Sequence, residues 1–183
     1  MKFSRNWVIL LLTGLGLPAQ AALLRIDQSQ SRIEVAVNST AGSFVGKLEK
    51  YQATVECQPP EPLPAKADVS FDFKDFKTGI PDRDTHMLKW LQYPKNPTAS
   101  FHLKSWKQEG GDTYAVGELA LHGIQKEIRM PVTINRKGDQ YEIEGTARVD
   151  YRDFGLPKIH TALVFTVDPH IRIQFRLVGR TAE

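Results

Sequence analysis

Residues 128–149 read IRMPVTINRKGDQYEIEGTARV, and this segment carries the clearest information about the fold. From Ile128 to Asn135 apolar side chains alternate with polar or proline ones, and a similar alternation runs from Tyr141 to Val149. The intervening Lys137-Gly138-Asp139 is a turn signal. Because successive side chains of a β-strand point to opposite faces, each half predicts a strand with one apolar and one polar face. The segment therefore predicts two antiparallel strands joined by a short turn.

The same period of two recurs along most of the chain after residue 22. Turn signals at Gly110-Gly111-Asp112 and Asp168-Pro169 separate the alternating segments, and the prolines from Pro59 to Pro64 predict a stiff loop. About eight or nine strands with one apolar face can form a sandwich or a closed barrel, both with that face inward. The residues predict an all-β antiparallel domain and leave these two architectures open. The other predicted strands are 32–37, 67–74, 99–104, 117–122, 163–167 and 171–177, together with a less regular strand region at 48–55.

One segment, from Asp82 to Leu91, departs from the alternation. Met87, Trp90 and Leu91 recur at helical spacing, and an acidic residue at the start suits a helix N-terminus. The segment predicts a short helix in a connection between strands, lying over one end of the sheet.

The N-terminus has the three parts of a secretory signal. Lys2 and Arg5 supply a positive region, residues 7–17 are largely apolar, and Ala19-Gln20-Ala21 presents small residues for cleavage. The apolar stretch is about half the roughly 20 residues that a membrane-spanning helix needs, so we expect no integral membrane segment after cleavage. The expected parts are a cleavable signal peptide and a mature domain, residues 1–21 and 22–183.

Charge and cysteine content exclude some classes of function. The formal charge is +3, and the loss of the two signal charges lowers it to +1. Since the mature part contains no run of lysines or arginines, we expect no nucleic-acid partner. Cys57 is the only cysteine, so the chain closes no internal disulfide. We interpret this residue as a small buried or half-buried hydrophobe, with pairing to another chain as the alternative.

Motifs for catalysis or metal binding are weak. The histidines stand at positions 86, 102, 122, 160 and 170, too far apart in sequence for a metal motif. No serine or cysteine has the sequence context of an activated nucleophile with its base. We therefore expect no metal, no cofactor and no enzyme activity.

An ordered set of short motifs runs through most of the mature part: Ile26-Asp27, Ser31 to Val35, Phe44 to Leu48, Lys77-Thr78-Gly79, Arg83 to His86, Tyr93-Pro94, Ala99 to Phe101, Gly117 to Ile124 and Arg152 to Leu156. In this order and at these spacings the chain resembles the YceI-like family, which comprises extracytoplasmic proteins with a lipocalin-like barrel. Two features depart from the family pattern. Asn38 stands where a histidine is frequent, and residues 87–92 replace a stretch rich in aromatic and acidic residues.

The resemblance implies a lipocalin-like barrel of about eight strands around a hydrophobic cavity. It implies that the cavity binds, without catalysis, an amphiphile with a long apolar chain, such as a polyisoprenoid or an isoprenoid quinone. It also implies a periplasmic location. Because relatives are sometimes encoded beside, or fused to, membrane cytochromes, it suggests a membrane cytochrome or another quinone-linked partner. A homodimer stays open.

The inward-facing apolar residues are the candidates for the lining of such a cavity. A packed core would have the same composition, so the sequence leaves a cavity and a filled core open. The candidates are Phe71, Phe73, Phe101, Leu119, Leu121, Met130, Ile143, Phe165, Ile173 and Phe175.

A cluster of polar residues in the predicted helix is the candidate for the barrel mouth. Arg83, Asp84 and His86, together with Trp90, would hold a ligand head group through charge-assisted hydrogen bonds. The alternative is a capping and ion-pair network that pins the helix to a loop.

Three functions follow from these features. The first is an exported binding protein that carries, stores or sequesters a long-chain amphiphilic lipid. The second is a stress-related or interaction module with a filled core and no lipid ligand. The third and weakest is an enzyme that acts on a lipid with Asp84 and His86.

Overall fold

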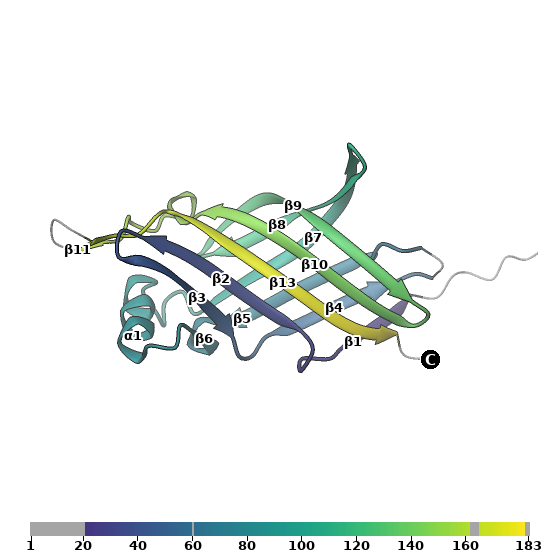
Figure 1. Ribbon diagram of the computed structural model, residues 1–183, viewed down its shortest axis with the longest axis horizontal. Helices are drawn as coiled ribbons and strands as arrows, with labels where there is room; N and C mark the ends of the chain where they lie inside the picture. Colours follow the sequence, from purple (N-terminus) through teal and green to yellow (C-terminus); the bar gives the residue numbers. More distant parts are fainter. Residues whose placement is uncertain (1–20, 60, 162–164, 182–183) are drawn as a thin grey trace, which may run out of the picture.

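The computed structural model describes residues 21–59, 61–161 and 165–181, with only the backbone at positions 161 and 165 (Figure 1). The predicted signal peptide, residues 1–21, lies outside this part of the chain except for Ala21. Among the described residues, none of the helices combines the length and the apolar character needed to span a membrane.

Eight antiparallel strands form a closed ring (Figure 1). β13 pairs with β10 on one side and with β1 on the other, and the second pairing closes the barrel. The predicted all-β antiparallel fold is confirmed, and the barrel rather than the sandwich is the architecture. In order around the ring the strands are β1 (Ala22–Ile26), β4 (Gln52–Cys57), β5 (Lys66–Asp72), β7 (Thr98–Glu109), β8 (Asp112–Leu121), β9 (Ile124–Lys137), β10 (Gln140–Asp150) and β13 (His170–Thr181).

The wall continues beyond this ring at one end of the barrel. β13 pairs with β1 over residues 179–181 and with β2 (Arg32–Ser39) over residues 172–176. β2 pairs in turn with β3 (Gly42–Leu48), and β3 with β6 (Phe76–Lys77). These strands lie at the end of the barrel that carries the helix (Figure 1).

The predicted strand 67–74 ends earlier in the structure, as β5 stops at Asp72 and η1 (Phe73–Asp75) follows, and two further predicted strands differ. The segment 48–55 is not one strand, because Leu48 ends β3 and a bend precedes the start of β4 at Gln52. The segment 163–167 contributes only β12 (Phe165–Thr166), which pairs with β11 (His160–Thr161), and residues 162–164 are outside the described chain.

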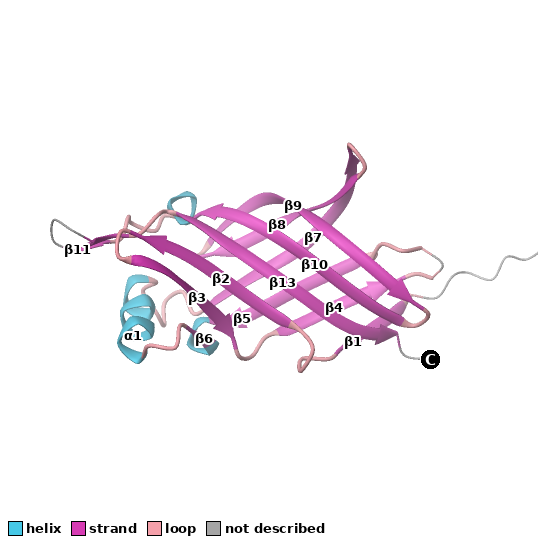
Figure 2. Cartoon of the chain, in the orientation of Figure 1, coloured by secondary structure: helices cyan, strands magenta, loops and turns pink. Residues whose placement is uncertain are grey.

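The helices gather at one end of the molecule (Figure 2). The predicted short helix is α1 (Pro81–Trp90), which has proline at its first turn together with Asp82 and Asp84. A fixed proline φ and acidic side chains both favour a helix start. Two single 3-10 turns, η1 (Phe73–Asp75) and η2 (Tyr151–Phe154), follow β5 and β10.

The buried side chains form two clusters. The larger one lines the inside of the barrel with side chains from seven strands of the ring, and half-buried side chains of β5 pack against it. The smaller one lies under α1 and η2 and contains Phe73, Leu91, Ala99, Tyr151, Leu156 and Val167. The period-two pattern thus builds the barrel interior, and the second cluster packs the helical end against it.

Candidate ligand-binding cavity

An apolar cavity with a volume of about 120 Å³ lies inside the barrel. Among the described residues around it, only Ser100 and Trp106 have polar side chains, and Ser100 is exposed on the outer face, so the Trp106 indole N–H is the polar group on the inside. That N–H donates a 2.8 Å hydrogen bond to the carbonyl oxygen of Pro64, so it is already satisfied by the protein. The lining residues are Ile33, Leu48, Val55, Pro64, Ala67, Val69, Phe71, Ser100, Phe101, Leu103, Trp106, Ala115, Leu119, Ile128, Met130, Val132, Ile143, Ala147, Ile173, Phe175 and Leu177.

Glycines in the wall make room for the far ends of two aromatic rings. A Cβ atom at Gly117 would lie 2.4 Å from Phe101 Cζ, and one at Gly145 would lie 2.5 Å from Phe175 Cζ. Such distances are far inside van der Waals contact, so each ring occupies the space that a side chain on the glycine would fill. The two rings therefore cover the wall and leave the middle of the barrel open.

Seven of the ten predicted lining residues border this cavity: Phe71, Phe101, Leu119, Met130, Ile143, Ile173 and Phe175. Phe73 does not, because the Asp72 side chain accepts a hydrogen bond from the Lys74 N–H and turns the chain out of β5 into η1. Leu121 lies between the two buried clusters, and the side chain of Phe165 is outside the described part of the chain. Ligand binding by these residues stays a prediction.

The alternation does not predict two other lining residues, Trp106 and Pro64. The register of β7 against β8 shifts between Leu103 and Ser105, and this irregularity turns Trp106 inward. Such a bulge inserts one residue and reverses the alternation. Pro64 lies in a loop, where the period of two has no meaning. Ser100 is exposed and stands out of phase with the inward Phe101, and the other lining residues share the alternation of the predicted set.

Arg83 and Asp84 form hydrogen bonds that hold the start of α1 to the loop before it. Asp84 Oδ1 accepts hydrogen bonds from the Thr78 N–H at 2.9 Å and from the Thr78 hydroxyl at 2.6 Å. Arg83 Nε donates to the same hydroxyl at 3.0 Å, and its guanidinium lies 4.0 Å from the centre of the Phe44 ring. These contacts match the capping alternative, since they pin the helix to the preceding loop.

Trp90 also makes structural contacts. Its indole N–H donates to the carbonyl oxygen of Pro157 at 3.0 Å, and its ring meets Tyr151 edge-on with centroids 5.0 Å apart. His86 is exposed on α1. Of the four predicted mouth residues, His86 alone has no contact within the described residues that occupies its side chain. A head-group role for this set stays a prediction.

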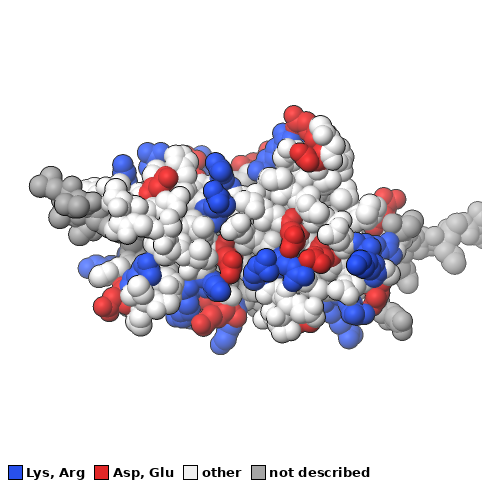
Figure 3. All heavy atoms as spheres, in the orientation of Figure 1, with Lys and Arg blue, Asp and Glu red and all other residues white. Residues whose placement is uncertain are grey.

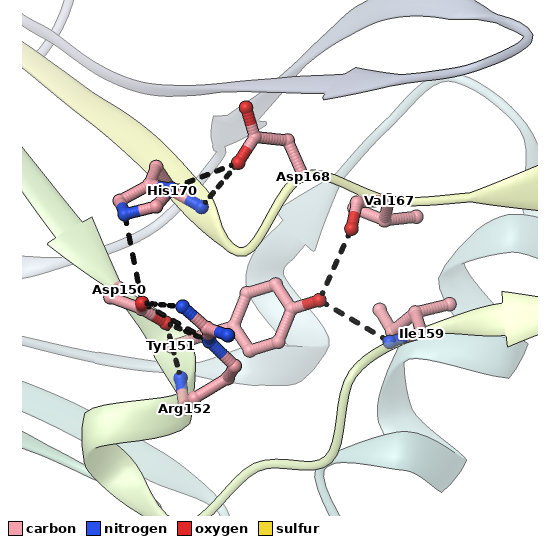
Figure 4. A network of polar contacts seen from close by, with 7 residues as sticks. All are labelled: Asp150, Tyr151, Arg152, Ile159, Val167, Asp168 and His170. Atoms are coloured by element: carbon pink, nitrogen blue, oxygen red, sulfur yellow. Dashed lines mark hydrogen bonds and ion pairs between the residues drawn. The ribbon is translucent and has the colours of Figure 1, made fainter.

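A polar network fixes the connection between β10 and β13 at the helical end (Figure 4). The Tyr151 hydroxyl accepts a hydrogen bond from the Ile159 N–H at 3.2 Å and donates to the carbonyl oxygen of Val167 at 3.4 Å. Next to it, Asp150 accepts from the Arg152 N–H at 2.9 Å and from Arg152 Nη2 at 2.6 Å. The network holds η2 and the returning chain over the end of the barrel.

The Asp150 carboxylate should make the unfolding free energy depend on pH in the acidic range. Hydrogen bonds from Arg152 lower the pKa of Asp150 to about 2, from 3.8. Because the folded pKa is below the unfolded one, this stabilisation is present above pH ~4 and is lost as the pH falls towards 2. We expect the difference in unfolding free energy between wild type and Asp150→Asn to be constant above pH ~5 and to shrink between pH ~4 and 2 in urea titrations. A difference that stays constant down to pH 2 would contradict this role.

Other titratable groups lie away from the cavity. As predicted, Cys57 is buried, and burial raises the pKa of its thiol, so the reactive thiolate is disfavoured. His102 Nδ1 lies 2.5 Å from Asp68 Oδ1 on the outer face of the barrel. Within the described residues, no three histidine, cysteine or acidic side chains gather as metal ligands would. In the face shown in Figure 3, both signs of charge are interspersed over the outer wall.

Comparison with known proteins places the chain in a family. The UPF0312 protein of Pseudomonas aeruginosa strain LESB58 is 26% identical over 149 residues, covering 75% of this chain and 78% of that protein. The crystal structure of BcnA from Burkholderia cenocepacia has a TM-score of 0.74 at 19% identity, covering 84% of this chain and 99% of that one.

A second solved structure, described as a polyisoprenoid binding domain from Saccharophagus degradans, has a TM-score of 0.65 at 13% identity and covers 89% of this chain and 100% of that one. At these identities both structures support the barrel fold alone. The family model for the YceI-like domain matches residues 24–179, which is most of the sequence. The chain therefore belongs to the YceI-like family.

Proposed function

We propose that this chain is an exported, non-enzymatic binding protein of the periplasm that holds a long-chain amphiphilic lipid, of the polyisoprenoid or isoprenoid quinone type, in its barrel. The observation that carries the proposal is the apolar cavity inside the closed ring. Burial of apolar surface contributes roughly 25 cal/mol per Å², so an apolar chain needs no polar contacts to be held there. The polyisoprenoid named for the Saccharophagus degradans domain is a ligand of the same chemistry.

The composition of the cavity favours binding over catalysis. None of the described residues that line it has a titratable side chain. A general acid or base must lie within hydrogen-bond reach of the reacting atoms, and this lining offers none. The predicted catalytic pair is also unsuited, because Asp84 is hydrogen-bonded to Thr78.

The size of the cavity supports the second candidate, a module with a filled core. Its volume of about 120 Å³ is close to the ~150 Å³ of an apolar cavity that holds one benzene molecule. A chain of several isoprene units would therefore fit only if half-buried side chains such as Phe71 and Phe101 turned aside. The two candidate functions differ in whether these side chains can rotate to admit a lipid chain.

Native mass spectrometry and lipid extraction separate the two candidates. The protein is purified without detergent from the periplasmic fraction of the cells. The lipids extracted from it are compared with those extracted from an unrelated exported protein of the same preparation. We expect an isoprenoid lipid in molar proportion to the barrel, and uptake of a fluorescent polyprenyl analogue by protein stripped of lipid. A lipid-free protein that also takes up no analogue would overturn the binding function and favour the filled core.

A further inference from the structure

The wall of the barrel has a seam between β9 and β10. Their pairing starts at Lys137 and Gln140 and ends where Val132 pairs with Gly145. Beyond this point, in the described chain, residues 124–131 of β9 pair only with β8, and residues 146–150 of β10 only with β13. Pro131 stands at the boundary, and a proline has no N–H to donate to a neighbouring strand. Between this point and the helical end the two strands share no ladder pairs in the described chain, and the start of β9 meets the continuation of β10 again at η2, where Ile124 lies beside Gly155.

A polar groove of about 410 Å³ runs over the outer face at the same place. The tip of the β7–β8 hairpin, which stands out from the barrel in Figure 1, contributes Asp112 and Thr113 to it. The wall contributes the remaining lining residues: Arg32, Glu34, Pro131, Val132, Thr133, Glu144, Gly145, Thr146, Gln174 and Phe175.

The groove and the inner cavity lie on opposite sides of the wall where the β9–β10 pairing ends. Val132 and Phe175 line both of them. Between these residues β10 presents Gly145, which has no side chain, and next Ala147, which lines the cavity with a single methyl group. The wall between the apolar interior and the polar exterior therefore carries little side-chain volume from β10 here, and the Phe175 ring, which rests on Gly145, covers it on the inside.

We infer that the seam is a lateral opening through which the polar end of the bound amphiphile leaves the barrel and binds in the outer groove. This inference rests on the proposed lipid-binding function, and it assigns the head group to the β9–β10 seam rather than to the α1 end. At the α1 end, Arg83 and Asp84 are bonded to Thr78, and the buried cluster under the helix contains Phe73 and Leu91.

The chemistry of the groove selects a neutral head group that forms hydrogen bonds. Glu34 pairs with Lys47 at 3.5 Å and Glu144 with Arg176 at 3.2 Å, so both carboxylates are compensated. Arg32 and Asp112 add one charge of each sign. The structure gives no partner within the described residues to the Thr146 hydroxyl or the Gln174 amide. Hydroxyl and carbonyl groups of a ligand suit such a lining, whereas a phosphate would find no cluster of cations.

The first test uses displacement of the apolar dye N-phenyl-1-naphthylamine by three decyl probes: decyl maltoside, decyl phosphate and decane. We expect the double variant Thr146→Val/Gln174→Leu to bind decyl maltoside about tenfold more weakly, since each lost hydrogen bond costs about twofold to tenfold. Its affinity for decane should stay within about twofold. The control, Thr54→Val, changes an outward threonine on β4, across the ring from β9, and should leave all three affinities unchanged.

The second test locates the head group directly. A decyl chain ending in a neutral nitroxide is added to ¹⁵N-labelled protein, and paramagnetic broadening of amide signals is recorded. We expect broadening at Thr133, Thr146 and Gln174, and none at Asp84 or Lys89 on α1.

The outcomes separate this inference from the proposed function. Broadening on α1, or equal effects of the double variant on decane and decyl maltoside, would overturn the lateral opening while dye binding upholds the cavity. Tighter binding of decyl phosphate than of decyl maltoside would overturn the neutral head group. Wild-type protein that binds neither the dye nor decane would instead overturn the proposed lipid binding.

Discussion

Replacement of Ala67 by phenylalanine is expected to abolish uptake of apolar probes while the barrel stays folded. Ala67 is half-buried on β5 and borders the cavity. The added phenyl ring suits a volume of about 120 Å³, because benzene fits an apolar cavity of ~150 Å³. We expect the affinity for N-phenyl-1-naphthylamine to fall at least tenfold, or about 1.4 kcal/mol. The unfolding free energy should hold or rise by about 0.5–2 kcal/mol, as for other cavity-filling changes.

The matched control is the same substitution on the outer face. Ala120 lies on β8 between the inward Leu119 and Leu121, so its side chain points away from the cavity. Ala120→Phe should leave dye binding unchanged. If Ala67→Phe instead destabilised the protein by about 1–3 kcal/mol in urea unfolding with no loss of dye binding, the interior would already be filled. That outcome would favour the second candidate function.

The sequence predicted the inner face of the barrel because alternation is a local property of each strand. Closure is not local. β13 pairs with both β1 and β2, and this branching depends on the stagger of strands that lie far apart in sequence. The alternation of single strands does not encode that stagger, so the sequence left sandwich and barrel open.

The errors within the candidate site have local causes. Phe73 continues the alternation of Phe71, but a side-chain hydrogen bond from Lys74 N–H to Asp72 ends the strand between them. Aspartate often forms such a turn, so the signal was present and the period of two outweighed it. Pro131 was a second such signal, since proline in a central strand marks an edge or a gap in pairing. In both cases a single residue, Asp72 or Pro131, overrides the regular alternation around it.

The head-group prediction rested on the chemistry of the side chains alone, and the residues that they contact in the fold were unknown. Arg83 and Asp84 have the chemistry for binding an ionic group, but Thr78 engages both of them. Only the fold shows that this threonine lies within reach. The outer groove had no signal in the sequence at all, because its residues come from β2, β9, β10, β13 and the start of β8. Such a composite surface exists only after the strands are in register.

Truncation of Phe73 and of Phe101 should separate stability from binding. Phe73 is only 7% exposed and packs edge-on against Phe71, with ring centroids 5.3 Å apart, in the cluster under α1. Phe73→Ala should therefore lower the unfolding free energy by about 3–5 kcal/mol in urea titrations. Dye affinity of the folded protein should stay within about twofold, because this ring does not border the cavity.

Phe101, in contrast to Phe73, should matter more for ligand binding than for stability. Its ring rests on Gly117 but faces the cavity on its other side, so it loses fewer contacts on truncation. Phe101→Ala should cost at least about 1 kcal/mol less than Phe73→Ala in the same titrations. It should also enlarge the cavity and change the affinity for apolar probes, with longer chains gaining most. If both variants lost equal stability and neither changed the dependence of affinity on chain length, the cavity would not be the binding site, because a ring in its wall would then behave as ordinary core.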